Sequence, residues 1–410
     1  MALFEKVAIA NRGEVAVRII RACHELGIKT VLLHSEADEG TLAYRLSDEV
    51  ICIGASAISQ SYLNMEKVIQ GAIAGGADAI HPGFGFLSEN ASFAKKCQES
   101  KLNFIGPKPE TIELFGDKIS AKKLVQTTEC PVIPGYNGDD QKESTLLVEM
   151  DKIGYPVIVK AAGGGGGRGL KVAHSKAEAQ QAIESARREG LTAFNSGRLF
   201  LEKYLGDAKH IEAQIFGDCT GKIYHLHERE CSVQRRHQKV IEEGLGCISD
   251  EMRQKIHQSA VSVAKAAKYL GAGTVEFLVQ DDQFYFLEMN TRLQVEHPVS
   301  EMLTGLDLVK GQLYAACDQP VLWEQSQIVA RGHAIECRVY AEDPYLGGVP
   351  SVGKLGFCRW PSGPGRRFEV GFEEGDEVTS FYDSMLAKVI VHDETRPRAC
   401  LLYTSDAADE

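Results

Sequence analysis

The sequence predicts a mixed α/β protein (α+β overall) built from three successive regions. Up to about residue 115, short apolar strands alternate with helical patterns, which is typical of an open parallel sheet covered by helices. The centre carries a glycine-rich loop between two apolar strands, and the last part is rich in strands and prolines. With 410 residues, 44% hydrophobic and 25% charged, the chain is long enough for two or three domains.

In the first region, residues 1–115, the elements follow one another closely. The predicted strands are Val7–Ala10, Thr30–His34, Ala79–Ile80 and Phe104–Gly106. The apolar spacing of Val15–Leu26 predicts a helix between the first two strands. Strands separated by helices favour parallel pairing, so we expect an open parallel α/β sheet.

The central region is predicted to span residues 116–317 and to include a mobile lid at 131–205. Within the lid, the capping box of Ser175 and Glu178 predicts a helix that runs towards Gly190. Residues 318–398 are predicted to form a β-rich region that completes a cleft.

A polar face recurs at every second residue near position 290. In an extended chain alternate side chains share a face, so these groups would look into one space while their neighbours face the core. One alternative is the wet side of an ordinary amphipathic strand, and another is that the residues after Asn290 reach the same site from a loop. The polar residues of this face are Glu288, Asn290, Arg292, Gln294 and Glu296.

Two carboxylates of this part of the chain are predicted to lie side by side. Thr274–Gln280 and Phe284–Asn290 read as a hairpin, and folding it about Asp282 sets Glu276 opposite Glu288. Like charges repel, and oxygen ligands favour Mg²⁺ or Mn²⁺ completed by substrate phosphates, so the pair predicts a metal with a nucleotide. A slip of one residue in the turn would instead place the acids on opposite faces.

A glycine-rich loop supplies the expected phosphate contact. The apolar strand before it ends at Lys160, and Leu170–His174 reads as another strand after it. A Walker A loop needs Lys and Ser or Thr after its last glycine, and a dinucleotide fingerprint should open a helix, so neither fits. We therefore predict a hairpin flap with a lysine beneath it, against the alternative of a flexible linker.

Composition excludes several classes of protein. The net charge of −12 argues against nucleic acid as a partner, so the basic run Arg235–Lys239 is interpreted as attracting a small anion. His81 and His297, each followed by proline, are interpreted as structural. No apolar run approaches the ~18 residues that a membrane span needs. The eleven cysteines form no CxxC pair and no hydrophobic leader is visible, so we expect a cytoplasmic protein with reduced thiols.

Together these motifs resemble one family, the ATP-grasp enzymes, and within it the biotin carboxylases. The resemblance runs from Lys6 to about Val391 and implies a central ATP-grasp fold between the N-terminal sheet and the β-rich region. The segments that carry it are Ile9–Glu14, His81–Asn90, Gly116–Lys118, Lys160 with its glycines, Glu228–Lys239, Glu288–Pro298 and Arg331–Arg338.

The resemblance implies roles for individual residues, with ATP and Mg²⁺ (or Mn²⁺, two ions) as cofactors. Residues that resemble the nucleotide site are Lys118, Lys160, Gly165 and Gly166 at the phosphates, Glu202, Lys203 and Leu205 at the adenine, and His210, Gln234 and His237 in the wall. Residues that resemble the metal ligands are Glu276, Glu288 and Asn290.

The same resemblance implies a bicarbonate substrate that attacks ATP to form carboxyphosphate, followed by carboxylation of biotin on a carrier protein. Glu296 resembles the base, because bicarbonate must lose a proton to become a nucleophile. Arg338 resembles the residue that stabilises the enolate-like form of biotin. The residues that resemble the bicarbonate site are Lys239, Arg292, Gln294 and Val295.

Further expectations concern partners and the end of the chain. A biotin carboxyl carrier protein or domain, carboxyltransferase subunits and a homodimer are implied by the resemblance, as in an acetyl-CoA or acyl-CoA carboxylase. The tail at 399–410 matches nothing in the family, so we expect an incomplete C-terminal domain. Two rival functions stay open: another ATP-grasp carboxylate ligase, and an inactive nucleotide-binding fragment.

Overall fold

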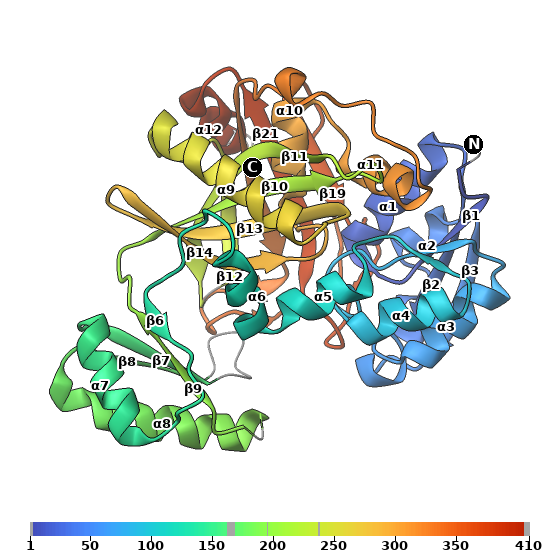
Figure 1. Cartoon of the computed structure of the whole chain (residues 1–410). Coiled ribbons are helices and arrows are strands. Elements are labelled where there is room, and N and C mark those ends of the chain that lie inside the picture. Colours follow the sequence, from blue (N-terminus) through green and yellow to red (C-terminus); the bar gives the residue numbers. More distant parts are fainter. Residues whose placement is uncertain (1–2, 162–168, 195, 237, 406–410) are drawn as a thin grey trace.

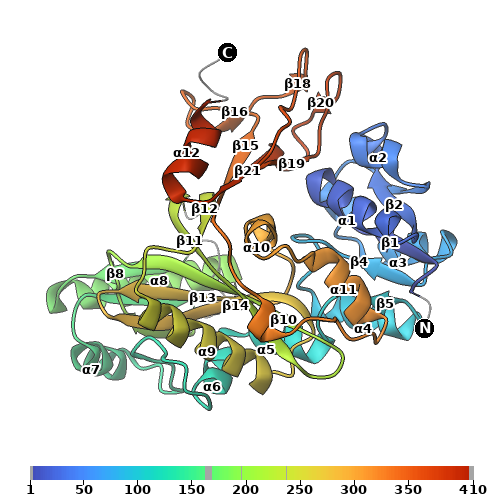
Figure 2. The ribbon, with the colours of Figure 1, turned by 90° about the horizontal axis from the view of Figure 1, so that it is seen from above.

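The computed structural model describes residues 3–161, 169–194, 196–236 and 238–405. Its N-terminal part, central region and C-terminal strands surround a shared middle, and Figure 2 shows the three in separate sectors. In Figure 1 a smaller sheet with two helices stands out from the rest of the molecule. None of the described helices is both long and apolar enough to cross a membrane.

The N-terminal part contains a five-stranded parallel sheet of order β3-β2-β1-β4-β5, which confirms the predicted fold class. The edge strand β3 was not predicted, although four consecutive residues of its sequence are apolar. The strands are β1 Lys6–Ile9, β2 Lys29–Ser35, β3 Glu49–Gly54, β4 Ala79–His81 and β5 Asn103–Phe104. The helices are α1 Gly13–Glu25, α2 Leu42–Leu46, α3 Met65–Ala74, α4 Ala91–Glu99 and α5 Pro109–Gly116, with 3-10 turns η1 Glu36–Asp38 and η2 Ile58–Gln60.

Local sequence explains where these helices begin. Asn64 and Asn90 precede α3 and α4, and each side chain accepts a hydrogen bond from a backbone N–H in the first turn. The apolar side of α1, which includes Val15 and Ile19, is buried in one core with Val7 and Ile9 of β1.

A four-stranded sheet of order β6-β9-β7-β8 forms the part that stands out in Figure 1, and it lies within the predicted lid range of 131–205. The helix expected after Ser175 is present, and the Glu178 carboxylate accepts from the His174 N–H at 3.0 Å. The elements of this part are β6 Gly135–Tyr136, α7 Glu143–Ile153, β7 Val157–Ala161, β8 Leu170–Ala173, α8 Lys176–Phe194 and β9 Leu199–Lys203, and α6 Lys118–Val125 precedes them.

The largest sheet has eight antiparallel strands in the order β14-β13-β10-β11-β12-β15-β21-β19. It runs from the central region into the C-terminal region without a break, because β12 pairs with β15. Its strands are β10 Lys209–Gly217, β11 Ile223–Arg235, β12 Gln238–Gly244, β13 Gly271–Gln280, β14 Gln283–Asn290, β15 His333–Tyr340, β19 Arg366–Val370 and β21 Met385–Asp393. The helices around it are α9 Asp250–Ala266, α10 His297–Thr304, α11 Leu308–Ala316 and α12 Arg396–Ser405, with the 3-10 turn η3 Gln325–Gln327.

Two small ribbons complete the C-terminal region, and they pair β16 Glu342–Asp343 with β17 Val349–Pro350 and β18 Gly353–Lys354 with β20 Glu377–Val378.

The hairpin β13–β14 pairs Glu276 with Glu288, as predicted, but by a different route. The turn is not centred on Asp282: Gln280 pairs with Gln283, which leaves a two-residue turn and a register one residue away from the predicted one. Leu287 is an extra residue between two ladder pairs, and this β-bulge restores the pairing of the two acids.

The strand ends at Asn290, so the prediction of one extended segment as far as Glu296 is wrong. Residues 291–296 form a loop that leads into α10. Arg292, Gln294 and Glu296 nevertheless make contacts in the same place, as described below.

Candidate active site

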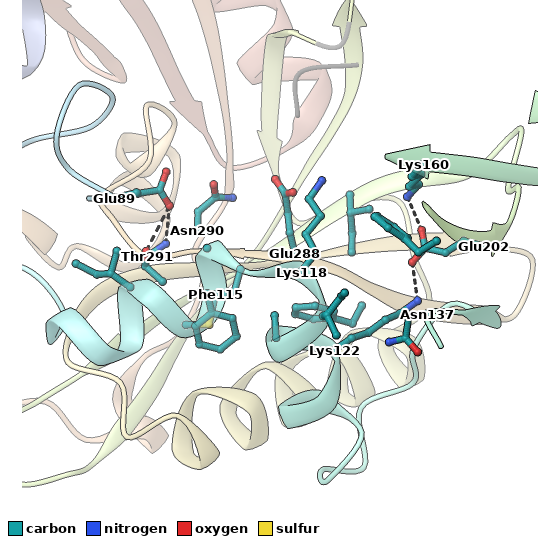
Figure 3. Close-up of a pocket in the computed structure, with 18 residues that line it drawn as sticks. Glu89, Phe115, Lys118, Lys122, Asn137, Lys160, Glu202, Glu288, Asn290 and Thr291 are labelled. Carbon is teal, nitrogen blue, oxygen red and sulfur yellow. Dashed lines mark hydrogen bonds and ion pairs between the residues drawn. The ribbon is translucent and has the colours of Figure 1, made fainter. Parts of the chain in front are cut away.

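One cavity between the lid, α6 and β14 contains five of the predicted site residues (Figure 3). Asn290, Glu288 and Lys118 extend from its floor in one direction, and Lys160 of β7 approaches from the lid. Glu202 of β9 lies beneath Lys160. The cavity therefore combines lysines with carboxylates, which is the donor set for a phosphate and a hard cation.

Two lysines meet on Glu202. Lys160 forms an ion pair with one carboxylate oxygen, and Lys122 lies 2.6 Å from the other. Although burial opposes ionisation, Lys160 and Lys122 hold the pKa of Glu202 below its usual value. A bound phosphate would therefore compete with Glu202 for these two cations.

Other predicted nucleotide residues lie outside this cavity. The Lys203 ammonium donates to the carbonyls of Gly154 and Tyr155 at 2.8 and 2.9 Å, and Leu205 is half-buried. Neither is among the residues that line the cavity. Gly165, Gly166 and His237 lie outside the described residues.

Glu276 gathers three donors beside Glu288. It accepts from Asn290 Nδ2 at 2.8 Å and from Lys239 at 2.9 Å, and His210 Nε2 lies 2.8 Å away. Burial opposes ionisation of Glu276, yet Lys239 and His210 lower its pKa. Removal from water, and then the Glu276 charge, raise the pKa of Glu288.

The acid pair fits a hard cation. Two carboxylates in register across a hairpin, one of them exposed to the cavity, provide oxygen ligands whose repulsion a divalent ion would relieve. The oxygen of the third predicted metal ligand already has a hydrogen-bond partner, because Asn290 Oδ1 accepts from Arg292 at 3.1 Å.

Lys239 is the centre of the second half of the site. Its ammonium lies 2.5 Å from Glu212, 2.9 Å from Glu276 and 2.8 Å from Glu296. Burial disfavours the charged form, but the three acids raise the pKa of Lys239 well above its usual value. Lys239 is therefore a permanent cation that neutralises part of an acidic cluster.

Glu296 is fully buried between Lys239 and Arg338, which lies 3.1 Å from its second oxygen. Burial acts against ionisation, but Lys239, Arg338 and Arg229 hold the pKa of Glu296 well below its usual value. Glu296 is thus ionised and able to accept a proton. A substrate anion that drew Lys239 away would raise the basicity of Glu296.

Arg292 is held in place by its neighbours. Its guanidinium donates to Glu89 at 2.8 Å, to Gln294 Oε1 at 2.8 Å and to Asn290. Gln294 in turn lies 3.4 Å from Glu276. The loop after β14 thus delivers its even-numbered side chains to the same site.

Several residues around this centre were not predicted. Glu212 of β10 and Glu242 of β12 are buried partners of Lys239 and Arg338, and buried Arg229 lies 2.6 Å from Glu212. Burial raises the pKa of Glu242 to about 7, even though Arg338 donates to it. A signal existed for β10, because His210, Glu212 and Gln214 alternate with apolar residues as clearly as the predicted face does.

A second cavity lies beside Arg338, between the N-terminal part and the C-terminal strands. Arg338 and Val295 line it together with Gln238, Phe84 and Tyr382. The Val295 carbonyl accepts from buried Lys388 at 2.7 Å, which holds this loop against β21. The last three lining residues were not predicted, since they come from three distant parts of the chain.

The basic run and the two histidines separate into different roles. Lys239 enters the site, whereas exposed Arg235 forms an ion pair with Glu342 at the surface. His81 and His297 are fully buried; burial lowers the pKa of His81 to about 3, and His297 Nδ1 lies 2.7 Å from the Gln294 carbonyl. Both are therefore neutral structural groups, as interpreted.

The lid sheet, the paired acids and Lys160 near the end of β7 define the ATP-grasp class of folds. Sequence models agree along the chain: the biotin carboxylase N-terminal domain matches residues 3–112, the ATP-binding domain of the carbamoyl-phosphate synthase L chain matches 117–322, and the biotin carboxylase C-terminal domain matches 336–404. The C-terminal match and helix α12 both extend past residue 398, where the predicted C-terminal region ends. The predicted domain boundaries at residues 115, 317 and 398 stay predictions.

Named relatives cover almost the whole chain. Biotin carboxylase of Allochromatium vinosum is 50% identical over 97% of this chain and 89% of its own length. The alpha subunit of mitochondrial methylcrotonoyl-CoA carboxylase from Dictyostelium discoideum is 46% identical, and this chain spans 58% of it. The chain belongs to the biotin carboxylase family.

Solved structures agree. The biotin carboxylase–β,γ-ATP complex from Campylobacter jejuni is 43% identical, with a TM-score of 0.92 over 97% of this chain and 89% of that one. The biotin carboxylase domain dimer of Hydrogenobacter thermophilus 2-oxoglutarate carboxylase, in complex with MgADP, ADP and bicarbonate, has a TM-score of 0.93 at 42% identity, over 99% of this chain and 90% of that one.

Proposed function

We propose that this chain catalyses the ATP-dependent carboxylation of biotin on a carrier protein, with bicarbonate as the carbon source and carboxyphosphate as the intermediate. The observation that carries the proposal is the position of Glu296. Its ionised carboxylate lies between Lys239 and Arg338 and shares Lys239 with the acid that faces Glu288. A base, an anion site and a metal–phosphate site are thus contiguous.

The nucleotide is assigned to the cavity beneath the lid. Lys118 and Lys160 would neutralise its phosphates, and Glu276, Glu288 and Asn290 would hold Mg²⁺ or Mn²⁺, with two ions expected. The metal supplies neutralisation of the charge that develops during phosphoryl transfer. If Asn290 Oδ1 bound the metal ion, it would no longer accept the hydrogen bond from Arg292.

Bicarbonate is assigned to the space bounded by Lys239, Arg292, Gln294 and Val295. Arg292 presents a planar guanidinium that Gln294 and Glu89 hold in place, which suits a planar oxyanion. Binding near Lys239 would weaken the contact of Lys239 with Glu296 and so raise the basicity of Glu296. Glu296 would then take the proton and leave an oxygen to attack the γ-phosphate.

Biotin is assigned to the cavity lined by Arg338. Its apolar wall at Phe84 suits a bicyclic ring, and the Arg338 guanidinium would stabilise an enolate-like ureido oxygen. The carrier would be a biotin carboxyl carrier protein or domain. We further propose carboxyltransferase partners, a homodimer and a cytoplasmic location.

The final acceptor is determined by those partners. Relatives of this chain include the alpha subunit of methylcrotonoyl-CoA carboxylase and a pyruvate carboxylase subunit of Methanothermobacter thermautotrophicus. Acetyl-CoA, another acyl-CoA and pyruvate are therefore the acceptors to be compared once the partner proteins are identified.

A coupled ATPase assay with free biotin tests the proposal. We expect ATP hydrolysis that requires bicarbonate and rises with biotin, and a decrease in kcat of about 10²- to 10⁴-fold in Glu296→Gln with nucleotide affinity unchanged. Glu251→Gln makes the same change at an exposed position of α9 and serves as the control. Stimulation by a different carboxylate instead of bicarbonate would show another ligase, and nucleotide binding without any turnover would show an inactive fragment.

A further inference from the structure

Three histidines gather on the opposite side of the central sheet from Lys239. His225 and His227 belong to β11 and His257 to α9, and one ring nitrogen from each lies within 4.8 Å of the others. The rings of His225 and His257 stack with centroids 4.1 Å apart, while His227 meets His257 edge-on. The proposed carboxylation reaction uses none of these side chains.

A β-bulge creates this arrangement. Opposite β10, Glu228 pairs with Ala213 and His225 pairs with Ile215, so two residues of β11 stand opposite Gln214. His225 and Glu228, three apart in sequence, thereby share one face of the sheet. That face is covered by α9, because Ala213 and Ile215 are in one core with Ile256 and Ala260.

His227 occupies the bulge itself with a φ of 62°, a conformation that side chains other than glycine rarely adopt. The sequence thus keeps a histidine where a glycine would be unstrained. Such outliers concentrate at functional sites, and the ring that results faces His257.

The second ring nitrogens of His257 and His227 each have polar partners. His257 Nε2 lies 2.8 Å from Glu228, whose second oxygen accepts from Arg253 at 2.6 Å. His227 Nε2 lies 3.1 Å from the Ile328 carbonyl and accepts a hydrogen bond from the Ala330 N–H at 3.0 Å. Ligating histidines commonly donate their second N–H to a carboxylate or a backbone carbonyl, which fixes the ring.

Two of the remaining ring nitrogens are buried and have no hydrogen-bond partner among the described residues. They are Nδ1 of His225 and Nδ1 of His227. A metal ion on His227 Nδ1 would require the tautomer protonated at Nε2, which donates to the Ile328 carbonyl in place of accepting from the Ala330 N–H. Burial and the neighbouring imidazoles lower the pKa of His225 to about 3 and also lower that of His227, so both rings are neutral.

We propose that His225, His227 and His257 bind a divalent transition-metal ion, with Zn²⁺ as the best match. Three imidazole ligands suit Zn²⁺, Cu²⁺ or Ni²⁺ and not Mg²⁺, which prefers oxygen. His225 and His227 are half-buried, so a water molecule can occupy a fourth position. The ion would link β11 to α9. It would also stabilise the connecting segment, residues 317–332 between α11 and β15, where the Gln325 side chain accepts from the His225 N–H and donates to the His225 carbonyl.

Zn²⁺ titration against a chromophoric chelator, with Mg²⁺ in excess to occupy the acidic site, tests this proposal. We expect one Zn²⁺ per chain and a rise in thermal midpoint on binding. His257→Gln and Glu228→Gln should each bind Zn²⁺ at least about tenfold more weakly. The first variant loses a ligand, and the second keeps all three ligands but loses the carboxylate that orients the His257 ring. Co²⁺ should give a visible absorption band that both variants weaken.

Two control variants separate this site from others. His24→Gln changes a surface histidine of the N-terminal part, and Glu288→Gln changes the acid pair; both should bind Zn²⁺ like the unmodified chain. Equal Zn²⁺ affinity in His257→Gln would overturn the proposal, as would binding that only Glu288→Gln abolishes. Melting curves of the metal-free variants distinguish lost binding from lost folding, and Glu228→Gln, which keeps all three ligands, decides the matter if His257→Gln does not fold.

Discussion

Lys239 shows how a single buried cation organises this site. Glu212 and Glu296 are fully buried and Glu276 nearly so, and each lies within 2.9 Å of the Lys239 ammonium. Removing one partner of a buried ionic network costs more than the network contributes, because the charges left behind stay out of water. Stability and substrate binding therefore depend on the same residue.

Lys239→Met should destabilise the protein by about 3–5 kcal/mol at neutral pH. Lys239 holds down the pKa values of Glu276 and Glu296 in the unmodified chain, so the stabilising effect of these two acids is present above the ordinary carboxylate pKa and is lost as pH falls. Without Lys239 the same acids would be protonated more readily on folding. The difference in free energy of unfolding between the two proteins should therefore shrink on acidification.

Urea unfolding at neutral and mildly acidic pH measures that difference. Lys203→Met is a matched control, since the Lys203 ammonium contacts two backbone carbonyls and no acid. It should cost only about 1 kcal/mol, independent of pH. A pH-independent loss in Lys239→Met would show that packing, and not charge, explains the effect.

The sequence predicted the residues of this site better than their partners. Residues 288–296 carry their chemistry in one short segment, so alternation and the resemblance both reach them. Glu212, Arg229 and Glu242 come from three strands and are functional only because β10, β11 and β12 are neighbours. Strand order is set by long-range packing, which no local pattern encodes.

Among the elements, the β13–β14 hairpin shows how a predicted pairing can be correct although the predicted turn is not, because two shifts of register cancel. A symmetrical turn about Asp282 would pair the acids directly, whereas the actual two-residue turn shifts the register and Leu287 shifts it back. Asp281 adopts a φ of 53° in that turn, as primed hairpin turns require. Bulges leave no clear local signal, so only the structure could reveal this one.

Helix α12 depends on an acid that the strands hold. Glu243 of β12 accepts from His333 of β15 at 2.9 Å and from Arg396 of α12 at 2.6 Å. His333, and then Arg396, lower the pKa of Glu243 to about 2. A depressed pKa stabilises the fold above the unfolded carboxylate value, and this contribution is lost as pH falls towards 2.

Glu243→Gln should therefore reduce the free energy of unfolding by about 1–2 kcal/mol at neutral pH, allowing for the partial exposure of Arg396. The gap to the unmodified protein should close between about pH 4.5 and pH 2. Chemical denaturation across that range measures it, with Glu251→Gln on the exposed side of α9 as a control that should show no resolvable change. A gap that persists at low pH would contradict the role of the charge.

At the scale of the whole molecule, the eight-stranded sheet joins regions that the sequence separates. The predicted boundary near residue 318 follows chain order and composition, and the connecting segment is exposed there, with Leu322 at 96%. The sheet nevertheless continues across this point through β12 and β15. Pairing of strands almost 100 residues apart has a large loop-closure cost and no local signature, which is why the sequence did not predict it.

A cut in the connecting segment should therefore leave one folded particle. Ile241, Glu242 and Glu243 pair with β15, and the contacts of Arg338 with Glu242 and of Arg396 with Glu243 also cross the boundary. With a protease site inserted at Leu322, we expect the two cleaved fragments to co-elute in size exclusion and to melt in a single transition. Uncleaved protein with the same insertion is the control. Fragments that separate without denaturant would show that the regions fold as independent domains and that the shared sheet is only an edge contact. Co-elution would show that the continuous sheet holds the two fragments together and so holds Arg338 against Glu296.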